Sequence, residues 1–333
     1  MSMSEAIKAE GKGRARFVIG VTVGLVLPLI FGEAYARLRP PADIQEYLGD
    51  ASPLTGIYRP DSVLGADYRS IVDYRPAEAP PFSEIRPLNV PQTWLFFGNS
   101  FARQLSVKAR AELPSHRILF FREGKDRLHL RIAEARMLLK NGLAPERMIF
   151  TLVPGEIAAY VKLPLSAVYV NGGGAITYRV RMPPAPWNQL IAHSRLALMA
   201  WVHSGRYQAM PGFRPTLITE TVPEIVVADF RRLFGALGEL SREYAVPTTV
   251  IVFPDRRQIF FDDSKFAMQK MVIGLGREAG LDVFDPSPML RRYADKKALW
   301  DQTWHYTALG DALVFADLLN HFEEMRAAKK TAP

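Results

Sequence analysis

From residue 92 onward, short apolar runs alternate with longer stretches in which apolar residues recur at helical spacing. A short apolar run between turn signals is typical of a buried strand, and strands separated by helices form parallel sheets that are covered on both faces. The alternation therefore predicts an α/β fold with a doubly wound, three-layer parallel sheet. The predicted strands are Trp94–Phe97, Arg117–Phe121, Met148–Val153, Thr248–Phe253 and Leu281–Phe284. The predicted helices cover about 101–112, 127–141, 224–245, 264–279 and 307–325.

The segments around this pattern suggest a domain organisation. Residues 39–91 are rich in Pro, Asp and Tyr and have no long helical period, so we interpret them as a linker and a wrapping segment. The stretch 155–221 interrupts the alternation and contains Asn171-Gly172-Gly173-Gly174, which predicts an insertion over the active face. We therefore expect the α/β domain at 92–326, followed by a tail at 327–333.

The N-terminus combines a basic leader with an apolar segment. Residues 1–16 are polar and basic, whereas Phe17–Phe31 carries no charge. Extension of the segment to Leu38 gives a helix of about 33 Å, enough for a hydrocarbon core of roughly 30 Å. Because Lys and Arg remain on the cytoplasmic side, we expect 1–16 to be a cytoplasmic leader and 17–38 a single-pass signal anchor. The C-terminal domain would then lie on the periplasmic side of the inner (cytoplasmic) membrane.

Two details near the end of this segment bear on the anchor. Glu33 and Arg37 stand four residues apart and are expected to pair at the far interface. Ala34-Tyr35-Ala36 fits a signal-peptide cleavage site, so a cleaved signal is the alternative to an anchor. Both readings export the body of the chain.

Charge and composition exclude several classes of function. The formal net charge is +8, of which six Lys or Arg against three Glu place +3 within residues 1–39, and the remainder is spread along the chain. No basic stripe interleaved with aromatic residues appears, so we expect no nucleic-acid partner. The absence of cysteine excludes disulfides, thiolate metal sites and cysteine nucleophiles. The six histidines lack metal-ligand spacing, so no metal or other cofactor is expected.

The tripeptide Gly98-Asn99-Ser100 directly follows the predicted strand Trp94–Phe97. In open α/β sheets the carboxyl ends of the strands form the edge at which chemistry usually takes place. A helix that begins there directs its free N–H groups and positive dipole end toward the serine and a reacting carbonyl oxygen. Ser100 is therefore the candidate nucleophile, and its alternative role is that of a helix cap.

A histidine near the chain end provides the base that a weak serine nucleophile needs. His305 closes the segment Asp301-Gln302-Thr303-Trp304-His305, and a predicted helix follows it. We expect His305 to act first as general base and then as general acid. The alternative is a packed or surface histidine.

At these residues the chain resembles the SGNH, or GDSL-type, hydrolase and acyl-esterase superfamily. Gly98-Asn99-Ser100 resembles the family's Gly-Asp-Ser block, and Gly124 stands where a glycine N–H contributes to the oxyanion hole. His305 followed by Gly310 is similar to the final Asp-x-x-His block. The end of the anchor and the Tyr58 to Gly65 stretch also resemble membrane-anchored bacterial members. The resemblance covers most of the chain and implies a flavodoxin-like strand order.

The chain departs from the family pattern at two places. The family's third block supplies an oxyanion asparagine, whereas this chain has Val153-Pro154-Gly155-Glu156. Loss of one such donor typically costs about 3–4 kcal/mol of transition-state stabilisation, for which Asn99 or Asn171 would have to compensate. Glu156 is otherwise expected to be a charge-paired surface residue. Asp301 lies four residues before His305 instead of three, and Asp285 is the fallback partner for the imidazole.

The resemblance implies a cell-envelope esterase or acyl (acetyl) transferase that acts on a polysaccharide or glycan. Ser100 would attack the ester carbonyl, His305 would transfer the proton and Asp301 would orient His305. The backbone N–H groups of Ser100 and Gly124, with Asn99 as a further contact, would hold the oxyanion. The expected partners are an acylated glycan, the membrane through residues 17–38, and a membrane acyl-transfer or envelope assembly. The alternative is a catalytically degenerate fold that serves such an assembly as a scaffold or binding subunit.

Overall fold

The computed structural model describes residues 24, 26–38, 58–68, 90–121, 127–162, 164–165, 168–170, 176–178, 185–204, 221–261, 266–302 and 305–331. By its internal contacts the chain divides into two compact units. Unit 1 comprises Met1–Ala51 and Arg179–Gly212, and unit 2 comprises Ser52–Tyr178 and Phe213–Pro333. The expected leader at 1–16 and most of the expected linker at 39–91 lie outside the described residues.

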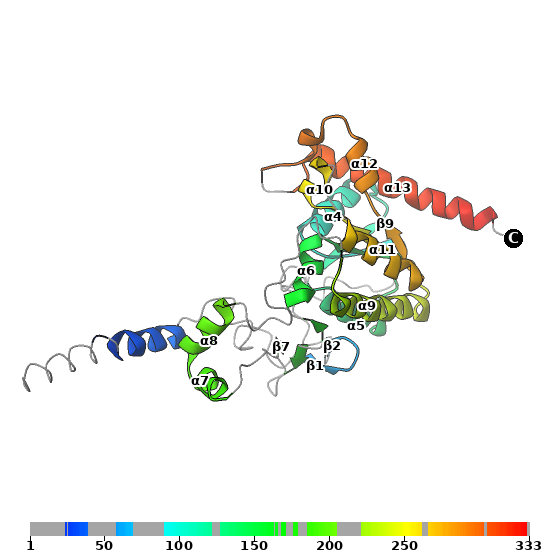
Figure 1. Cartoon of the computed structure of the whole chain (residues 1–333). Coiled ribbons are helices and arrows are strands. Elements are labelled where there is room, and N and C mark those ends of the chain that lie inside the picture. The colour runs from blue at the N-terminus through cyan, green and yellow to red at the C-terminus, as the bar shows by residue number, and fades with distance from the viewer. Residues whose placement is uncertain are drawn as a thin grey trace, which may run out of the picture. The chain divides into compact units, whose positions relative to one another are not determined.

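Unit 2 is built on a five-stranded parallel sheet (Figure 1). Its strands are β3 (Thr93–Phe97), β4 (Arg117–Phe121), β5 (Arg147–Leu152), β8 (Thr248–Val252) and β9 (Asp282–Phe284). The spatial order is β4-β3-β5-β8-β9, so β3, the first of these five strands in the sequence, lies between β4 and β5. This confirms the predicted α/β fold with a parallel sheet, and the order is the flavodoxin-like one.

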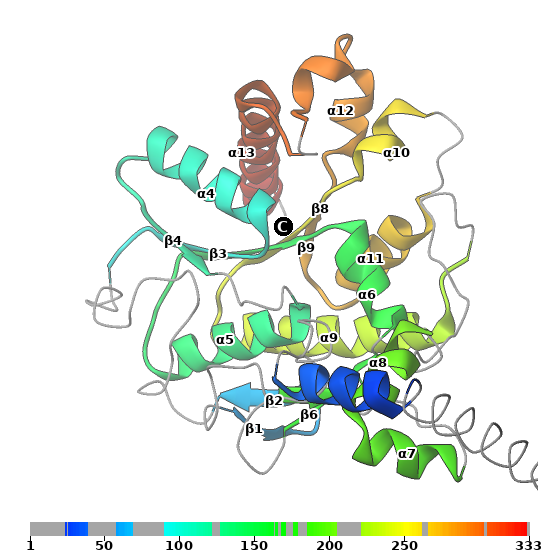
Figure 2. The same ribbon diagram turned by 90° about the vertical axis from the view of Figure 1, so that its left-hand side faces the viewer.

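Helices cover both faces of the sheet (Figure 2). One face carries α4 (Ser100–Glu112) and α13 (Ala308–Thr331), which pack against each other. The other face carries α5 (Leu128–Lys140), α6 (Pro154–Lys162), α9 (Glu224–Glu243) and α11 (Ala267–Glu278), of which α9 contacts the other three. The shorter helices α10 (Arg256–Phe260), α12 (Ser287–Arg292) and η2 (Lys296–Leu299) belong to the loops between β8, β9 and α13.

The apolar run of β3 explains why this strand sits inside the sheet. Successive side chains of a strand point to opposite faces, so a strand that is covered on both faces is apolar over most of its length. Trp94 and Phe96 belong to the core cluster shared with α4 and α13. Phe97, on the opposite face, stacks on Phe121 and Phe150 with ring centroids 5.2 and 4.7 Å apart.

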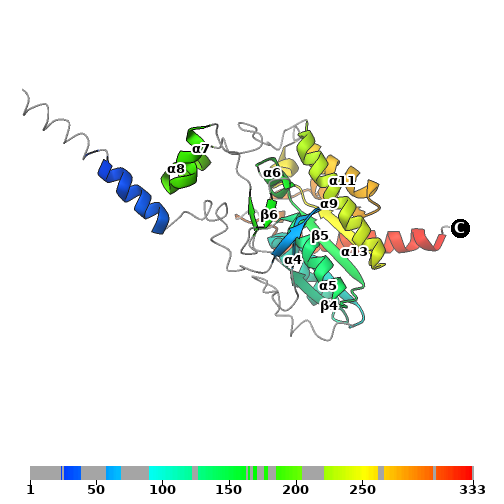
Figure 3. The ribbon, with the colours of Figure 1, turned by 90° about the horizontal axis from the view of Figure 1, so that it is seen from below.

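Helix α5 is buried on more than one side. The hairpin of β1 (Tyr58–Asp61) and β2 (Gly65–Tyr68) lies beside it, and β2 contacts it directly (Figure 3). A second hairpin, β6 (Val168–Val170) with β7 (Ile176–Tyr178), contacts the first. The polar residues His129, Arg131 and Glu134 are consequently buried together with the apolar ones.

Unit 1 contains the helical residues 26–38 and the hairpin of α7 (Trp187–His193) and α8 (Arg195–His203). No helix among the described residues is long and apolar enough to cross a membrane. Residues 17–23 and 25 of the expected anchor lie outside the described residues. Of the stretch 155–221 expected as an insertion, α6 and the β6–β7 hairpin fall in unit 2 and α7 and α8 in unit 1.

Candidate active site

The turn between β3 and α4 requires a glycine at position 98. A Cβ atom added there would collide with the side chain of Thr151 and would approach the Cβ atom of Ala102 within 2.8 Å. The backbone N–H of Gly98 donates to the carbonyl of Phe121 at 3.2 Å, which continues the pairing with β4. The chain therefore enters α4 close against β5, and this close approach fixes the position of the residue two places later.

Ser100 is the first residue of α4, and Asn99 is the N-cap. The Oδ1 atom of Asn99 accepts a hydrogen bond from the backbone N–H of Phe101 at 3.0 Å. The alternative in which Ser100 caps the helix is therefore wrong, because the neighbouring asparagine performs that role. The first N–H groups of a helix have no partner within it and carry its positive dipole end, so Ser100 lies where negative charge is stabilised.

His305 lies beside Ser100 across two hundred residues of sequence. The distance from His305 Nε2 to Ser100 Oγ is 2.7 Å. The imidazole is half-buried and packs near the ring of Phe101, with centroids 5.4 Å apart. If Nδ1 carries the ring proton, Nε2 accepts the hydroxyl proton of the serine, which is the geometry of a nucleophile and its base.

The loop that carries His305 is fixed at its backbone. Asp301 Oδ1 accepts from the backbone N–H of His305 at 3.0 Å, and the Asp301 N–H donates to the His305 carbonyl at 2.9 Å. Arg256 Nη1 reaches the Asp301 carbonyl at 3.3 Å and connects this loop to α10. Asp285, the fallback partner, instead accepts from the backbone N–H of Ser287 at the start of α12.

A buried ion pair lies beside the β3–α4 turn. Arg131 of α5 is fully buried, and its Nη2 atom lies 2.6 Å from Glu156 Oε1. The same Glu156 oxygen accepts from Asn99 Nδ2 at 3.1 Å. The Asn99 amide is thus engaged on both sides, by Phe101 and by Glu156. Three elements, α4, α5 and α6, are joined through this network directly behind the nucleophile.

Glu156 is not the surface residue that the sequence suggested. Only 11% of its side chain is exposed, and its second oxygen accepts from the backbone N–H of Val153 at 3.3 Å at the start of α6. The sequence reasoning also missed Arg131 as its partner. The available signal was an arginine between Leu130 and Ile132 in an apolar helical stretch, since a charge in such a place must find a partner.

Two of the predicted contacts cannot be placed. Gly124, the expected oxyanion glycine, and Asn171, the other candidate donor, lie outside the described residues. Their roles remain predictions.

Burial perturbs two acidic groups behind the His305 loop. Tyr306 is fully enclosed, which raises the pKa of its hydroxyl well above the usual value, with Asp311 and Asp285 adding to the effect. Burial also raises the pKa of Asp311 to about 6, against a lowering by Lys108. The loop therefore rests on a weakly hydrated region in which charge is disfavoured.

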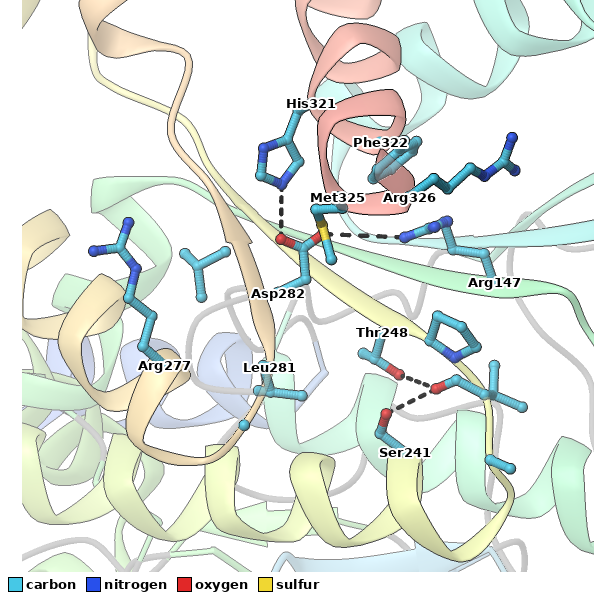
Figure 4. A pocket seen from close by; sticks show the side chains of 15 residues that line it. Arg147, Ser241, Thr248, Arg277, Leu281, Asp282, His321, Phe322, Met325 and Arg326 are labelled. Atoms are coloured by element: carbon cyan, nitrogen blue, oxygen red, sulfur yellow. Dashed lines mark hydrogen bonds and ion pairs between the residues drawn. The ribbon is translucent and has the colours of Figure 1, made fainter. Parts of the chain in front are cut away.

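A second polar cluster lies at the opposite, amino-terminal edge of the sheet and lines a cavity of about 610 Å³ (Figure 4). Asp282 at the start of β9 accepts from Thr249 Oγ1 at 2.7 Å and lies 2.7 Å from His321 Nε2. The guanidinium of Arg147 stacks on Phe322 at 3.8 Å from the ring centroid. These contacts connect α13 to the sheet, and we assign them a structural role.

No protein-family model matches the chain, and no curated protein matches it either. Among solved structures, the chain is similar to the lipase/acylhydrolase from Enterococcus faecalis, with 12% sequence identity and a TM-score of 0.35. The similarity covers 70% of this chain and 95% of that one. A likeness of this size shows neither a shared family nor a shared activity.

Proposed function

We propose that the chain is a serine esterase or acyltransferase of the cell envelope. It removes or transfers an acyl group, preferably acetyl, that is esterified to a polysaccharide or glycan. The observation that carries the proposal is the 2.7 Å contact between Ser100 Oγ and His305 Nε2. A serine hydroxyl is a weak nucleophile at neutral pH and becomes reactive when an adjacent imidazole accepts its proton. Its place at the start of α4 adds stabilisation of the charge that develops on the reacting carbonyl oxygen.

In the proposed reaction, Ser100 Oγ attacks the ester carbonyl carbon while its proton moves to His305 Nε2. The tetrahedral intermediate collapses when the bond to the alcohol breaks, and His305 returns the proton to that leaving oxygen. Water, or the hydroxyl of an acceptor glycan, then attacks the acyl-serine while His305 again takes the proton. The bond between the acyl carbon and Ser100 Oγ breaks, and His305 returns the proton to that serine oxygen. Water gives hydrolysis and an acceptor hydroxyl gives transfer.

The oxyanion in this scheme is held by backbone N–H groups. The N–H of Ser100 lies in the first turn of α4, where N–H groups have no acceptor within the helix, and Gly124 is carried over from the family resemblance. Asn99 has one Nδ2 proton committed to Glu156, which leaves its amide a single further N–H to offer.

The substrate class and the location rest on the resemblance and on the N-terminal sequence. Fold-level analogy does not identify a substrate, so an acyl ester is the coarsest chemistry that the resemblance supports, and the glycan is the finer part of the proposal. The uncharged segment behind a basic leader supports a single-pass anchor at 17–38 with the catalytic unit outside the cytoplasm. A reporter enzyme fused after Pro333 tests this topology, because activity on the cytoplasmic side would exclude an envelope substrate.

A second candidate function is a degenerate fold that binds without turnover. It is favoured by Glu156, because its carboxylate can only accept hydrogen bonds, whereas the resembled family has at this place an asparagine that donates one to the oxyanion. The two candidates differ in whether Ser100 is chemically reactive.

The decisive experiment measures hydrolysis of a small activated acetyl ester and covalent labelling by a serine-directed phosphonate. Ser100→Ala and His305→Ala are each expected to abolish nearly all turnover, and the double variant to be little worse, because the pair acts as a unit. Ser115→Ala is the matched control, since Ser115 Oγ also lies near a histidine, His116 Nδ1, at 3.2 Å but on an exposed surface. Absence of phosphonate at Ser100, even with an acetylated glycan present, would leave the scaffold function in place of the enzyme.

A further inference from the structure

Unit 1 exposes apolar side chains in a way that unit 2 does not. Thirteen large apolar side chains are strongly exposed among the described residues, and only four of them, Val63, Val107, Phe261 and Leu309, belong to unit 2. The nine in unit 1 are Val26, Leu27, Leu29, Ile30, Phe31, Tyr35, Leu38, Trp187 and Leu190. Unit 1 contributes a small minority of the described residues, so the concentration is high. Apolar surface gathered in this way marks contact with a membrane or another protein.

The sequence of the expected anchor and of the α7–α8 hairpin is also nearly free of charge. Residues 17–38 and 185–204 contain 42 residues, of which Glu33, Arg37 and Arg195 are the charged ones, whereas 23% of the whole chain is charged. Two of the three neutralise each other, because Arg37 Nε lies 2.7 Å from Glu33 Oε1.

The α7–α8 hairpin is docked on the C-terminal end of helix 26–38. Glu33 Oε2 accepts from Ser194 Oγ at 2.8 Å and from the backbone N–H of Leu196 at 2.9 Å, so it helps cap α8. Arg37 Nη2 donates to the carbonyl of His193 at 3.0 Å. The polar atoms of the junction satisfy one another, and the helices lie side by side (Figures 1 and 2).

An apolar groove of about 770 Å³ lies between helix 26–38 and this hairpin. Its walls include Leu29, Ile30, Leu190 and Ala200, and its polar end is formed by Arg37 and its neighbours. A groove of this composition fits an acyl chain along its length and a lipid headgroup at its polar end.

We propose that the α7–α8 hairpin is a second lipid-contacting segment, which lies in the outer interface of the bilayer beside the anchor. The inference rests on the proposed anchor at 17–38. Trp187 and Leu190 enter the lipid, while Asn188, Gln189 and His193 remain at headgroup level, the distribution expected of an interfacial helix.

A bilayer fits this surface better than a partner protein does. At 3.6 residues per turn, the exposed residues Val26, Leu27, Leu29, Ile30 and Phe31 span an arc of about 200° around helix 26–38, more than half of its circumference. An exposed apolar arc of this width is typical of a membrane environment, whereas a partner helix needs only a narrower apolar stripe.

Site-directed spin labelling of the full chain tests the proposal, and the absence of native cysteine makes single-site labelling direct. The protein is reconstituted in phosphatidylethanolamine and phosphatidylglycerol vesicles, with a nitroxide at Trp187→Cys or Leu190→Cys. Leu27→Cys is the lipid control, and Val107→Cys, at an exposed position of α4, is the water control. The nitroxides at 187 and 190 are expected to be relaxed more by oxygen dissolved in the membrane than by a water-soluble nickel complex. The label at 27 should show the same preference, and the label at 107 the opposite one.

Three results would overturn the proposal. If the labels at 187 and 190 prefer the nickel complex, as the label at 107 does, the hairpin lies in water. If the label at 27 also prefers the nickel complex, the proposed anchor is wrong as well. Immobilised labels that neither reagent reaches indicate contact between protein copies.

A second variant tests the docking contact. Glu33→Ala should abolish the oxygen preference at 187 and 190 while leaving the label at 27 in lipid, and Glu224→Ala on α9 should change neither. An unchanged preference in Glu33→Ala would refute the role of the junction. These readouts do not depend on Ser100, so a hairpin in water leaves the proposed esterase standing, and an inert serine leaves the lipid contact standing.

Discussion

The Arg131–Glu156 pair gives a prediction in which burial alone decides the outcome. Glu156→Gln keeps the size of the side chain and an oxygen to accept from Asn99, but it removes the negative charge. Arg131, which is fully buried, then loses its charged partner at 2.6 Å. We expect the variant to fold with an intact turn at Ser100 and a clearly reduced free energy of unfolding.

The magnitude follows from the environment of the two charges. Unit charges about 4 Å apart interact by about 4 kcal/mol at an effective dielectric constant of 20. Desolvation offsets much of this when the pair forms, but loss of the Glu156 charge leaves the guanidinium of Arg131 buried without this carboxylate, and breaking a buried ion pair typically costs about 3–5 kcal/mol. We therefore expect a loss of about 3 kcal/mol for Glu156→Gln.

Urea unfolding of the full chain in detergent, followed by tryptophan fluorescence, measures the effect. The matched control is Glu112→Gln, because the Lys108–Glu112 pair has the same 2.6 Å separation but side chains that are 30% and 40% exposed. We expect the control to change stability by no more than about 0.5 kcal/mol. Arg131→Met combined with Glu156→Gln should cost less than the sum of the single changes, since the buried guanidinium is removed together with the carboxylate that neutralises it. Equal effects of Glu156→Gln and Glu112→Gln, or strict additivity in the double variant, would refute the reasoning.

The remaining predictions concern the turn, a perturbed carboxyl and the His305 loop. Gly98→Ala should lower the free energy of unfolding in urea by about 2 kcal/mol and should lower phosphonate labelling, because the new Cβ atom collides with the side chain of Thr151. The control Gly155→Ala should be neutral or stabilising, because its new Cβ atom has no other atom within 4 Å. Burial raises the pKa of Asp311 from 3.8 to about 6, so its contribution to stability is present below pH 4 and is lost as the pH rises through 6. Asp311→Asn should therefore be more stable than wild type at pH 8, by about 1 kcal/mol after allowance for partial exposure, and equal to it near pH 3 by thermal unfolding. Asp301→Ala should lower ester turnover less than His305→Ala, and Asp301→Asn, which keeps an oxygen for the His305 N–H, should lower it less again. An Asn variant as inactive as the Ala variant would show that the charge of Asp301 is needed and not its hydrogen bond to the backbone.

The parallel sheet was predictable because its signal is local. A strand that is covered on both faces forms a nearly continuous apolar run, so a run such as Trp94–Phe97 is visible without knowledge of its neighbours. The carboxyl ends of such strands share one edge, which is why Ser100, after β3, could be proposed as a site residue. The contact between Ser100 and His305 joins residues that are far apart in the sequence. The sequence showed only their order along the chain and the helix expected after His305.

The helices α10 and α12 were not predicted because they are too short to show a period. They contain five and six residues, fewer than two turns, and tertiary contacts hold them in place. Asp255 caps α10 and Gln258 completes the capping box, a local signal that was present in the sequence. Helix α6 was hidden for another reason, since it begins in the stretch 155–221 where the alternation of strands and helices stops.

The Glu156 position bears on whether the site is active. The carboxylate of Glu156 contacts Asn99, the residue that precedes the nucleophile Ser100. Its negative charge would oppose the charge that develops on a substrate carbonyl oxygen. Arg131 neutralises that carboxylate at 2.6 Å, and Glu156 in turn holds the Asn99 amide that caps α4. The N–H groups in the first turn of α4 that Asn99 does not cap then lie at the positive end of the helix dipole, with the charge of Glu156 neutralised behind them. The ion pair is therefore compatible with an oxyanion hole made of backbone donors. On this argument the absence of the asparagine that the SGNH resemblance leads us to expect would lower the rate of the proposed reaction but would not by itself disable Ser100.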